Sequence, residues 1–351
     1  MKLKLKLFTL LMALVMVISL AACGSESTSG TSDGSNDEGA KKIKLNLSTP
    51  DPDTSSITLA GKHFAELVKE KSGGSIEVSV HPNGTLYGGD PSAAVKQLGA
   101  GSIDMLALST SLYANFVPEF NAISVPYLFD SKEKFVSFLN GEHGDKLLSM
   151  LDELKIEGLG LWTRPFRQIT NSKHPIKKPE DLKGIKIRVP NNPLWVEFFK
   201  RTGAVTTPMD FSEVYNALQL GTIGGQENPV GVIKSAKLHE VQKYLTISNH
   251  MADGWILGIN QAKFGDLTDD QKKVLQEAAK ETQSWKLKED EKNFNSTVDF
   301  LKENGMKVNE LTSDQQKAFV EVSKEAYPAF KKLVENDEFF QSVIKFAGKS
   351  E

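Results

Sequence analysis

The stretch GIKIRVPNNPLWVEFFKRTG, residues 184–203, contains the strand–helix unit on which the fold of this chain depends. Its first part, residues 185–190, alternates apolar and polar side chains, which is the pattern of a half-buried β-strand. Its second part, residues 192–203, has an early proline, apolar residues at helical spacing and Gly203 at its end, which predicts a short α-helix. A strand that leads directly into a helix favours the α/β class.

Arg188 occupies a particular face of this strand. Successive side chains of a strand point to opposite sides of the sheet, so Ile185, Ile187 and Val189 share one face and Lys186 and Arg188 share the other. The first set indicates a buried face. The second set is compatible with a solvated face or with a ligand-binding cleft.

Arginine is scarce in this chain, because only four of its 42 basic residues are arginine. Guanidinium offers a planar fork that matches a carboxylate with two parallel hydrogen bonds, whereas the ammonium group of lysine is a point charge. Three of the four, Arg164, Arg167 and Arg188, lie within 25 residues of sequence near the ends of strand-like segments. Periodicity alone leaves a solvated Arg188 and a ligand-binding Arg188 both open.

Strand-like and helix-like segments alternate from residue 43 onward, which indicates an α/β body with a largely parallel sheet. In such sheets ligands bind beyond the carboxyl ends of the strands. The last third of the chain is expected to be mainly helical. Strands are expected at residues 43–48, 75–82, 102–109, 121–129, 156–163, 185–190 and 204–208, and helices at residues 56–74, 91–101, 192–203, 211–220, 268–304 and from 312.

Length and composition are those of a globular protein large enough for two domains. The chain has 351 residues, 39% of them hydrophobic and 25% charged, which provides for a sizeable core. A formal charge of −3 at pH 7 gives no basic excess for binding nucleic acid.

The N-terminal segment has the form of an export signal. Residues 1–22 begin with lysines and continue with an apolar run of about 15 residues, which is shorter than a membrane span. The sequence LAAC, residues 20–23, resembles a bacterial lipobox, and the resemblance implies that Cys23, the only cysteine, becomes a diacylated N-terminus. The alternatives are a membrane-anchoring helix and a buried cysteine. The rest of residues 23–42 is small and polar and is expected to form a flexible tether.

Motifs for catalysis or metal binding are not found in the sequence. The six histidines lack the HExxH spacing or any other ligand spacing. No nucleophile elbow, phosphate-binding loop or dinucleotide fingerprint occurs. The interpretation is a protein that is not an enzyme and uses no metal or other cofactor.

Several sequence blocks together resemble one protein family. The blocks are FRQIT (166–170), PIKKPEDLKGIKIRVPNNP (175–193), GAVTTPMDFSEVYNALQLG (203–221), GGQENP (224–229) and HEVQKYLTISNH (239–250). In this order they are similar to the solute-binding proteins of tripartite ATP-independent periplasmic (TRAP) transporters, the DctP family, here in a lipoprotein form.

The resemblance implies a clamshell with two lobes, like a type II periplasmic binding protein, and a long helix that crosses both. Lobe I would contain residues 43–165 and about 254–293, and lobe II residues 166–253 and about 294–351. It also implies a small organic acid as ligand, small and large TRAP membrane subunits as partners, and uptake driven by an ion gradient. The protein would be lipid-anchored on the outer face of the cytoplasmic membrane.

The resemblance also assigns ligand-binding residues in lobe II. The family's carboxylate-binding arginine falls on Arg188, a second arginine on Arg167, and the amide of the QENP block on Asn228. Asn191 and Phe211 stand where the family contacts or covers the ligand.

Residues of lobe I leave the rest of the ligand open. Asp90 matches a polar contact of the family, although a helix N-cap before a proline is an equal alternative. Residues 109–112 read STSL where members that bind sialate have a Glu and an Arg, so sialate is not expected. Trp162 and Trp255 are expected in the core more than in the cleft. A C4-dicarboxylate, a sugar acid and another oxo or hydroxy acid all stay open.

Two other classes of function are compatible with an exported, lipid-anchored clamshell. One is the binding lipoprotein of an ABC transporter, and the other is an enzyme on a similar fold. Neighbouring genes for two membrane proteins without an ATPase would favour the TRAP assignment, and a turnover assay would identify an enzyme.

Overall fold

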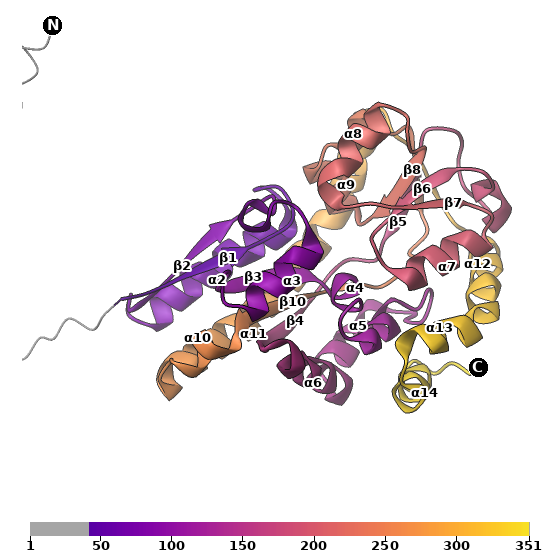
Figure 1. Cartoon of the computed structure of the whole chain (residues 1–351). Helices are drawn as coiled ribbons and strands as arrows, with labels where there is room; N and C mark the ends of the chain where they lie inside the picture. The colour runs from indigo at the N-terminus through magenta and orange to yellow at the C-terminus, as the bar shows by residue number, and fades with distance from the viewer. Residues whose placement is uncertain (1–41, 351) are drawn as a thin grey trace, which may run out of the picture. The chain divides into compact units, whose positions relative to one another are not determined.

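The computed structural model describes residues 42–350. The expected signal segment, Cys23 and nearly all of the tether lie outside the described residues. Within residues 42–350 the chain forms two β-sheets with helices packed against them (Figure 1). A largely parallel sheet was expected, but both sheets are mixed, because each contains a strand that runs antiparallel to both of its neighbours. None of the helices in this part is long and apolar enough to cross a membrane.

The first sheet, sheet A, has the strand order β2-β1-β3-β10-β4. Strand β1 pairs in parallel with β2 and β3, and β10 is antiparallel to both β3 and β4. The strands are β1 (Ile43–Ser48), β2 (Ile76–His81), β3 (Met105–Ser109), β4 (Ile156–Thr163) and β10 (Gly254–Asn260).

The second sheet, sheet B, has the order β11-β9-β5-β8-β6-β7. The strand around Arg188 pairs in parallel with β7 and β8, so it is an interior strand of the sheet. The strands are β5 (Gln168–Asn171), β6 (Lys186–Val189), β7 (Val205–Pro208), β8 (Gly225–Asn228), β9 (Tyr244–Ile247) and β11 (Lys307–Glu310).

The chain passes between the sheets at residues 164–167 and again at residues 248–253. We call these the first and second crossing segments. The strand that follows each of them, β5 or β10, is antiparallel to both of its neighbours. The crossing segments therefore leave from the carboxyl ends of β4 and β9, at the sheet edges where the other parallel strands also end. This is the edge at which α/β proteins place ligand groups.

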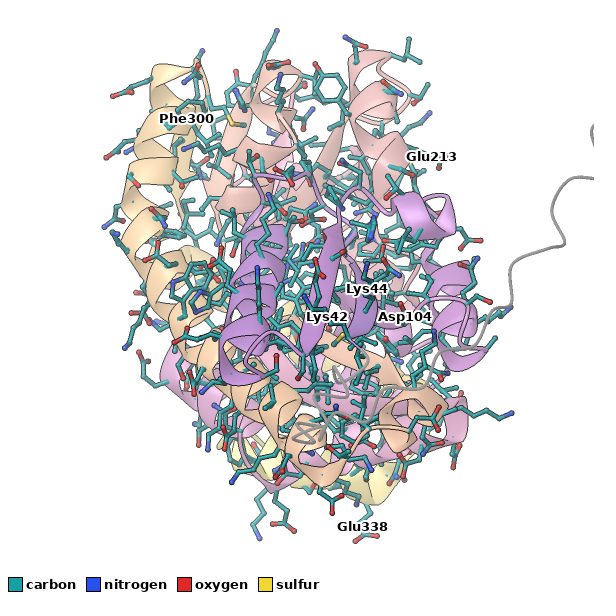
Figure 2. All side chains as sticks on the ribbon, turned by 90° about the vertical axis from the view of Figure 1, so that its left-hand side faces the viewer. Lys42, Lys44, Asp104, Glu213, Phe300 and Glu338 are labelled. Carbon is teal, nitrogen blue, oxygen red and sulfur yellow. The ribbon has the colours of Figure 1, made fainter. Side chains whose placement is uncertain are left out.

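Helix α11 (Asp269–Glu303) is 35 residues long and belongs to the cores beside both sheets. Its first half contributes Leu275 and Ala278 to the core with sheet A, and its second half contributes Val298 and Leu301 to the core with sheet B. In Figure 2 Phe300 of α11 lies at about the level of Glu213, whereas Lys44 of β1 and Asp104, the residue before β3, lie lower. The helix begins at the expected place, where Thr268 and Gln271 form a capping box with mutual hydrogen bonds.

The other helices cover the two sheets. The α-helices are α2 (Ser56–Lys71), α3 (Pro91–Gly99), α4 (Thr110–Tyr113), α5 (Lys132–Leu139), α6 (Glu142–Ser149), α7 (Pro193–Arg201), α8 (Val214–Gln219), α9 (Val230–Ser235), α10 (Gln261–Gly265), α12 (Ser313–Glu325), α13 (Tyr327–Val334) and α14 (Asp337–Phe346). The 3₁₀ helices are η1 (Thr85–Tyr87), η2 (Pro118–Ser124), η3 (Met150–Leu154), η4 (Pro179–Leu182), η5 (Phe211–Glu213) and η6 (Leu238–Glu240).

One expected strand is wrong. Residues 121–129 form the end of η2 and a loop, not a strand. Pro126 lacks the N–H that a strand ladder needs, and Tyr127 has a φ of 56°, which a strand does not allow. The apolar run is nevertheless buried in the core, as its composition requires.

The apolar residues of α11 differ in burial. Ala278, Val298 and Leu301 are buried. Val274 and Trp285 are only half-buried and pack against the edge of the core. The two-lobe residue boundaries stay a prediction.

Candidate functional site

The candidate site lies where the crossing segments meet the carboxyl ends of the strands. Arg164 and Arg167 stand on the first crossing segment and Asp253 on the second. Arg188 is near the end of β6, and Asn228 is the last residue of β8. All five side chains are at most 8% exposed, so the site is a buried polar region between two sheets.

Arg188 is buried without a carboxylate partner among the described residues. It is 4% exposed, and its Nε and Nη2 both donate to the carbonyl oxygen of Met209, at 2.9 and 2.6 Å. Nη1 makes no hydrogen bond within residues 42–350. Burial lowers the pKa of Arg188 to about 9, so the group is still protonated at pH 7 but lacks a compensating anion.

A small cavity borders Arg188. Its volume is about 40 Å³. The residues that line it come from segments next to sheet A and from segments next to sheet B. Phe211 forms part of the wall, with its ring centroid 5.9 Å from the Arg188 guanidinium carbon. Tyr87 contributes a buried hydroxyl that has no hydrogen-bond partner in the described chain. The expected positions of Arg188 and Phe211 thus meet at one cavity.

Arg167 differs from Arg188, because its fork is occupied by the protein. Nε and Nη2 bind the two carboxylate oxygens of Glu227 at 2.5 and 2.8 Å, and Nη2 also donates to the Glu227 carbonyl at 2.8 Å. The guanidinium carbon lies 4.4 Å from the ring centroid of Trp195. Only Nη1 faces elsewhere, 3.5 Å from Asp253. This geometry shows that Arg167 stabilises the site through Glu227. A contact of Arg167 with a ligand stays a prediction.

Arg164 has no ligand-binding role in the family resemblance, but it is part of the same buried region. Its Nη1 donates to Asp253 at 2.7 Å and its Nη2 to the side-chain oxygen of Asn228 at 3.1 Å. Its guanidinium stacks over Trp255 at 4.3 Å. Its Nε is buried and has no partner among the described residues.

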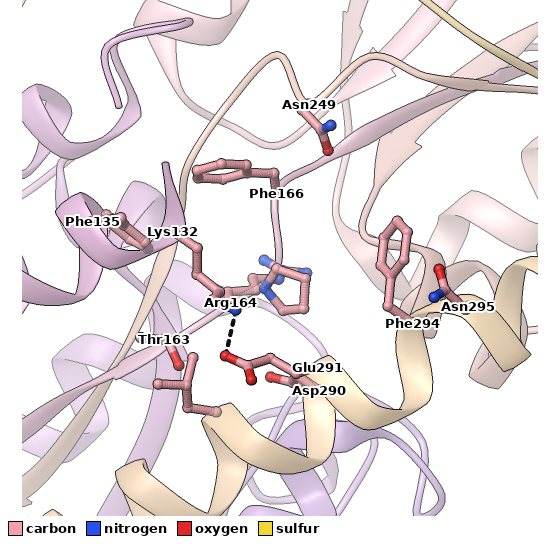
Figure 3. A pocket seen from close by; sticks show the side chains of 12 residues that line it. Lys132, Phe135, Thr163, Arg164, Phe166, Asn249, Asp290, Glu291, Phe294 and Asn295 are labelled. Carbon is pink, nitrogen blue, oxygen red and sulfur yellow. Dashed lines mark ion pairs between the residues drawn. The ribbon is translucent and has the colours of Figure 1, made fainter. Parts of the chain in front are cut away.

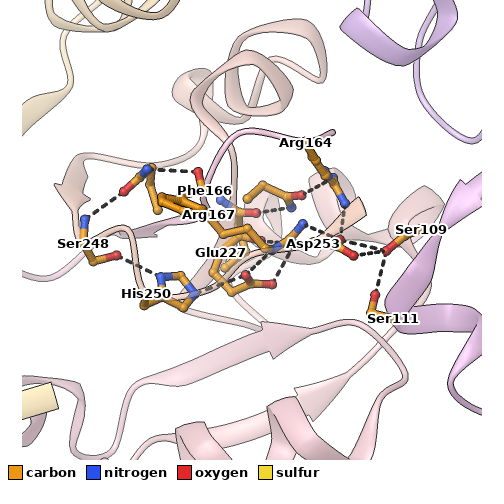
Figure 4. Close-up of polar contacts among 12 residues, drawn as sticks. Ser109, Ser111, Arg164, Phe166, Arg167, Glu227, Ser248, His250 and Asp253 are labelled. Atoms are coloured by element: carbon orange, nitrogen blue, oxygen red, sulfur yellow. Dashed lines mark hydrogen bonds and ion pairs between the residues drawn. The ribbon is translucent and has the colours of Figure 1, made fainter. Parts of the chain in front are cut away.

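Asp253 and Glu227 tie the two crossing segments together (Figure 4). Asp253 is fully buried and also accepts from Ser109 at 2.8 Å and Thr110 at 2.9 Å. Burial opposes the ionisation of Glu227, but pairing with Arg167 brings its pKa below the usual value. Burial lowers the pKa of His250, whose Nε2 lies 3.4 Å from Glu227. The charges of this network balance without any other group.

The remaining expected site residues differ in how they are held. The amide of Asn228 is used at both ends, since its Nδ2 donates to Gln226 at 2.7 Å and its oxygen accepts from Arg164. Asn191 is exposed and donates to Asp210 at 2.8 Å. Asp90 caps α3 by accepting from two backbone amides, which is the alternative that the sequence left open.

Asp210 and Glu213 have the sequence spacing of a capping box, but Asp210 does not form one. Its side chain makes no hydrogen bond to the backbone of η5, because it accepts from Asn191 instead. Trp162 is in the core, as expected, and its indole N–H donates to the carbonyl of Ala279. Trp255 is also buried, but it borders a second cavity.

This second cavity contains residues that sequence reasoning missed. It measures about 30 Å³ and is bordered by Asp51, Arg164, Trp255 and Lys286. Asp51 lies three residues beyond the end of β1, so the rule that places ligand groups at strand ends could have identified it. Lys286, by contrast, is a fully buried lysine of α11 that the helical pattern does not distinguish from solvated lysines.

A larger pocket of about 310 Å³ lies on another side of the first crossing segment (Figure 3). Phe166 and Phe294 give it apolar walls. Its lysine, Lys132, is paired with Glu291, and Arg164 is paired with Asp253. The pocket therefore offers no unpaired cation to a carboxylate.

Comparisons with known proteins agree on one family. The family model described as "Bacterial extracellular solute-binding protein, family 7", DctP, matches residues 47–333. The 2,3-diketo-L-gulonate-binding periplasmic protein YiaO of Escherichia coli is 34% identical over 269 residues, 77% of this chain and 81% of that protein.

Solved structures show the same fold. The sugar acid binding protein DctPAm from Advenella mimigardefordensis, in complex with galactonate, is 33% identical with a TM-score of 0.84, over 88% of this chain and 98% of that one. A TRAP periplasmic solute-binding protein from Sulfurospirillum deleyianum with bound succinate is 28% identical with a TM-score of 0.81, over 86% and 98%. The α/β fold with two lobes expected from the sequence is confirmed by these matches.

Proposed function

This chain belongs to the bacterial extracellular solute-binding proteins of family 7, and we propose that it captures a small organic acid whose carboxylate binds Arg188. The observation that carries the proposal is the pairing of the arginines. Arg164, Arg167 and Arg201 each have a carboxylate partner. Among the described residues Arg188 has none, although it is buried.

The energetics favour a ligand anion at Arg188. A buried charge without a partner carries a large desolvation cost, and a carboxylate held by two hydrogen bonds offsets it. A charge-assisted hydrogen bond contributes about 1.5–3 kcal/mol net. Loss of the Arg188 guanidinium would leave the ligand carboxylate unpaired, at a cost of about 3–5 kcal/mol, which is at least a hundredfold in affinity.

The relatives support an acid as the ligand. Those described above bind, by their names, a diketo sugar acid, galactonate and succinate. All three are carboxylates, and they differ in hydroxyl groups and in the number of carboxyl groups. The shared group is the one that Arg188 would bind.

The proposal includes delivery to the small and large membrane subunits of a TRAP transporter, with uptake driven by an ion gradient. Members of this family are solute-binding proteins. We therefore propose that this protein binds its ligand and releases it chemically unchanged. Diacylation of Cys23 would hold it on the outer face of the cytoplasmic membrane, since two acyl chains provide stable anchoring.

A ligand screen followed by titration tests the site. Small carboxylates are first ranked by their effect on the melting temperature, because ligand binding stabilises the folded state by mass action. The best acid is then titrated calorimetrically into the wild type and Arg188→Lys, which keeps the charge but loses the fork. We expect at least tenfold weaker binding by the variant.

Arg201→Lys is the matched control, because Arg201 is a half-exposed arginine paired with Glu197 on α7. It should bind the acid as the wild type does. Equal affinity of Arg188→Lys and Arg201→Lys would disprove the proposed site.

A further inference from the structure

Asp51 is the anionic counterpart of Arg188. It is 3% exposed, and neither oxygen of its carboxylate has a hydrogen-bond partner within residues 42–350; Oδ2 is completely buried. Its backbone is well held, since the Asp51 carbonyl accepts from the amide of Asn83 at 3.0 Å and the hydroxyl of Thr58 at 3.3 Å. The unpaired carboxylate is therefore placed by a rigid backbone.

The cations near Asp51 already have partners, with one exception. Arg164 is paired with Asp253, and Arg167 with Glu227. Lys286 is paired with Asp290 at 2.5 Å, and Asp290 also accepts from Ser56. Arg188 is the exception. Among the described residues, the region between the sheets thus holds an unpaired guanidinium, Arg188 on β6 of sheet B, and an unpaired carboxyl group, Asp51 in the loop after β1 of sheet A.

The cavity beside Asp51 has an unpaired donor as well as an unpaired acceptor. Both Asp51 and Arg164 border it, and Arg164 Nε is a buried N–H without an acceptor. A group that binds there must donate to Asp51 and accept from Arg164. The volume of about 30 Å³ is suited to a group about the size of a water molecule.

A hydroxyl group meets both requirements, because it has one donor and two acceptor positions. A second carboxylate would only accept, and it would face the negative charge of Asp51. An ammonium group would only donate, and it would face Arg164 and Lys286. Charge and hydrogen bonding together favour a neutral hydroxyl over a second carboxylate or an ammonium group.

We propose that Asp51 and Arg164 form a hydroxyl-binding subsite, and that the captured acid is a hydroxylated monocarboxylate, not a dicarboxylate. The acid's carboxylate binds Arg188 on the side of sheet B, and one of its hydroxyls donates to Asp51 on the side of sheet A. The inference rests on the proposed function, because it names the substrate class of the same site.

The test compares acids that differ only in hydroxyl groups. Galactonate and erythronate are titrated beside hexanoate and butanoate, which have the same carbon numbers without hydroxyls, and beside succinate. The wild type should bind at least one of the two hydroxy acids at least tenfold more tightly than the other three. Asp51→Asn should reduce this affinity at least tenfold and change the binding of the other acids less than threefold.

Two controls keep the result interpretable. Asp53→Asn removes an exposed carboxylate of the same loop, paired with Lys62, and should leave all affinities unchanged. The melting temperature of ligand-free Asp51→Asn should equal or exceed that of the wild type, because the change removes an unpaired buried charge.

The outcomes separate the two proposals. If Arg188→Lys weakens binding of the acids but Asp51→Asn leaves the hydroxy acids within twofold, the hydroxyl subsite is wrong and the carboxylate site stands. If Arg188→Lys has no effect on an acid that binds, the proposed carboxylate site is itself wrong. Binding of succinate or hexanoate as tight as that of the hydroxy acids, or no binding of any of the five, contradicts the inference.

Discussion

Arg167 and Glu227 form a buried two-point ion pair, with Nε–Oε2 and Nη2–Oε1 distances of 2.5 and 2.8 Å. The pair joins the first crossing segment to strand β8. It uses the fork of Arg167, which leaves Arg188 as the arginine without a carboxylate partner among the described residues. It also makes Arg167 a residue that positions the crossing segments, so stability experiments can separate its role from that of Arg188.

The ion pair itself can be tested through Glu227→Gln. The variant leaves the buried guanidinium of Arg167 without its main counter-charge, and we expect a loss of about 3–5 kcal/mol in the free energy of unfolding. Urea denaturation measures it. The control is Glu197→Gln, which breaks the half-exposed pair with Arg201 and should cost about 1 kcal/mol or less. Equal losses in the two variants would show that the buried ion pair contributes no more to the free energy of unfolding than the half-exposed pair.

The pH dependence of this pair has a defined sign. Because the pKa of Glu227 is lower in the folded state, its stabilising contribution is present above the unfolded pKa and is lost as pH falls through the folded pKa. The stability deficit of Glu227→Gln should therefore be largest near pH 7 and shrink as the pH falls below about 4.3, the usual pKa of Glu. Melting temperatures of both proteins from pH 7 downward measure this difference, and a constant deficit would contradict it.

Asp51 should show the opposite dependence. Burial raises the pKa of Asp51 above the ordinary 3.8, so folding favours the protonated carboxyl group. The contribution of Asp51 to the free energy of unfolding is therefore fully present below that value and is lost as pH rises through the folded pKa. Ligand-free Asp51→Asn should gain stability relative to the wild type as the pH increases from 3.5 to 7. An advantage that falls over this range would show that the carboxylate has a partner.

Arg188 is expected to lower the stability of the ligand-free protein and to raise its affinity for the acid. Replacing a buried charge by an apolar side chain of similar length is often neutral or stabilising, by about 1 kcal/mol or more. Ligand-free Arg188→Met should therefore unfold at an equal or higher urea concentration than the wild type, while its affinity for the acid falls at least a hundredfold. A clear destabilisation would mean that the hydrogen bonds to Met209 outweigh the desolvation cost.

Asn115 makes a contact between the sides of the two sheets. Its Nδ2 donates to the carbonyl of Asn191 at 2.7 Å, at an exposed position. Asn115→Ala should weaken ligand binding about two- to fivefold, because one hydrogen bond that holds the two sides of the site together is lost. The melting temperature without ligand should stay within one or two degrees. Calorimetric titration measures the change in affinity. The control is Asn293→Ala, which removes an exposed asparagine that is bonded only within α11.

Membrane attachment depends on Cys23 in the sequence-based proposal. Cys23→Ala should move the protein from the membrane fraction to the soluble fraction, because the acyl chains have no other attachment point in a chain with one cysteine. Fractionation of cells that express the variant tests this. Retention in the membrane fraction would place the anchor elsewhere.

The local structure of this protein could largely be predicted from its sequence. Strands β1 and β4 have the expected bounds, and the caps at Thr268 and Thr312 begin their helices as expected. These features depend on periodicity and on side chains within four residues of each other. The failures at residues 121–129 and at Asp210 arise from competition, since a tertiary contact or a loop conformation replaced the local pattern.

The roles of the arginines could be predicted only in part. Scarcity and strand position drew attention to Arg164, Arg167 and Arg188 alike, and the family resemblance selected two of them. What separates them is their partners: Glu227 lies 60 residues from Arg167, and Asp253 lies 89 residues from Arg164. No local pattern contains this information.

The sequence by itself determined many of the strands and helices and the family, because these depend on local periodicity and on short sequence blocks. Tertiary structure alone decided which charges remain unpaired. Pairing depends on which residues two distant crossing segments bring together in a buried region, where a single missing partner has a large cost. On this basis Arg188 and Asp51, 137 positions apart in the sequence, become the two ends of one proposed ligand site.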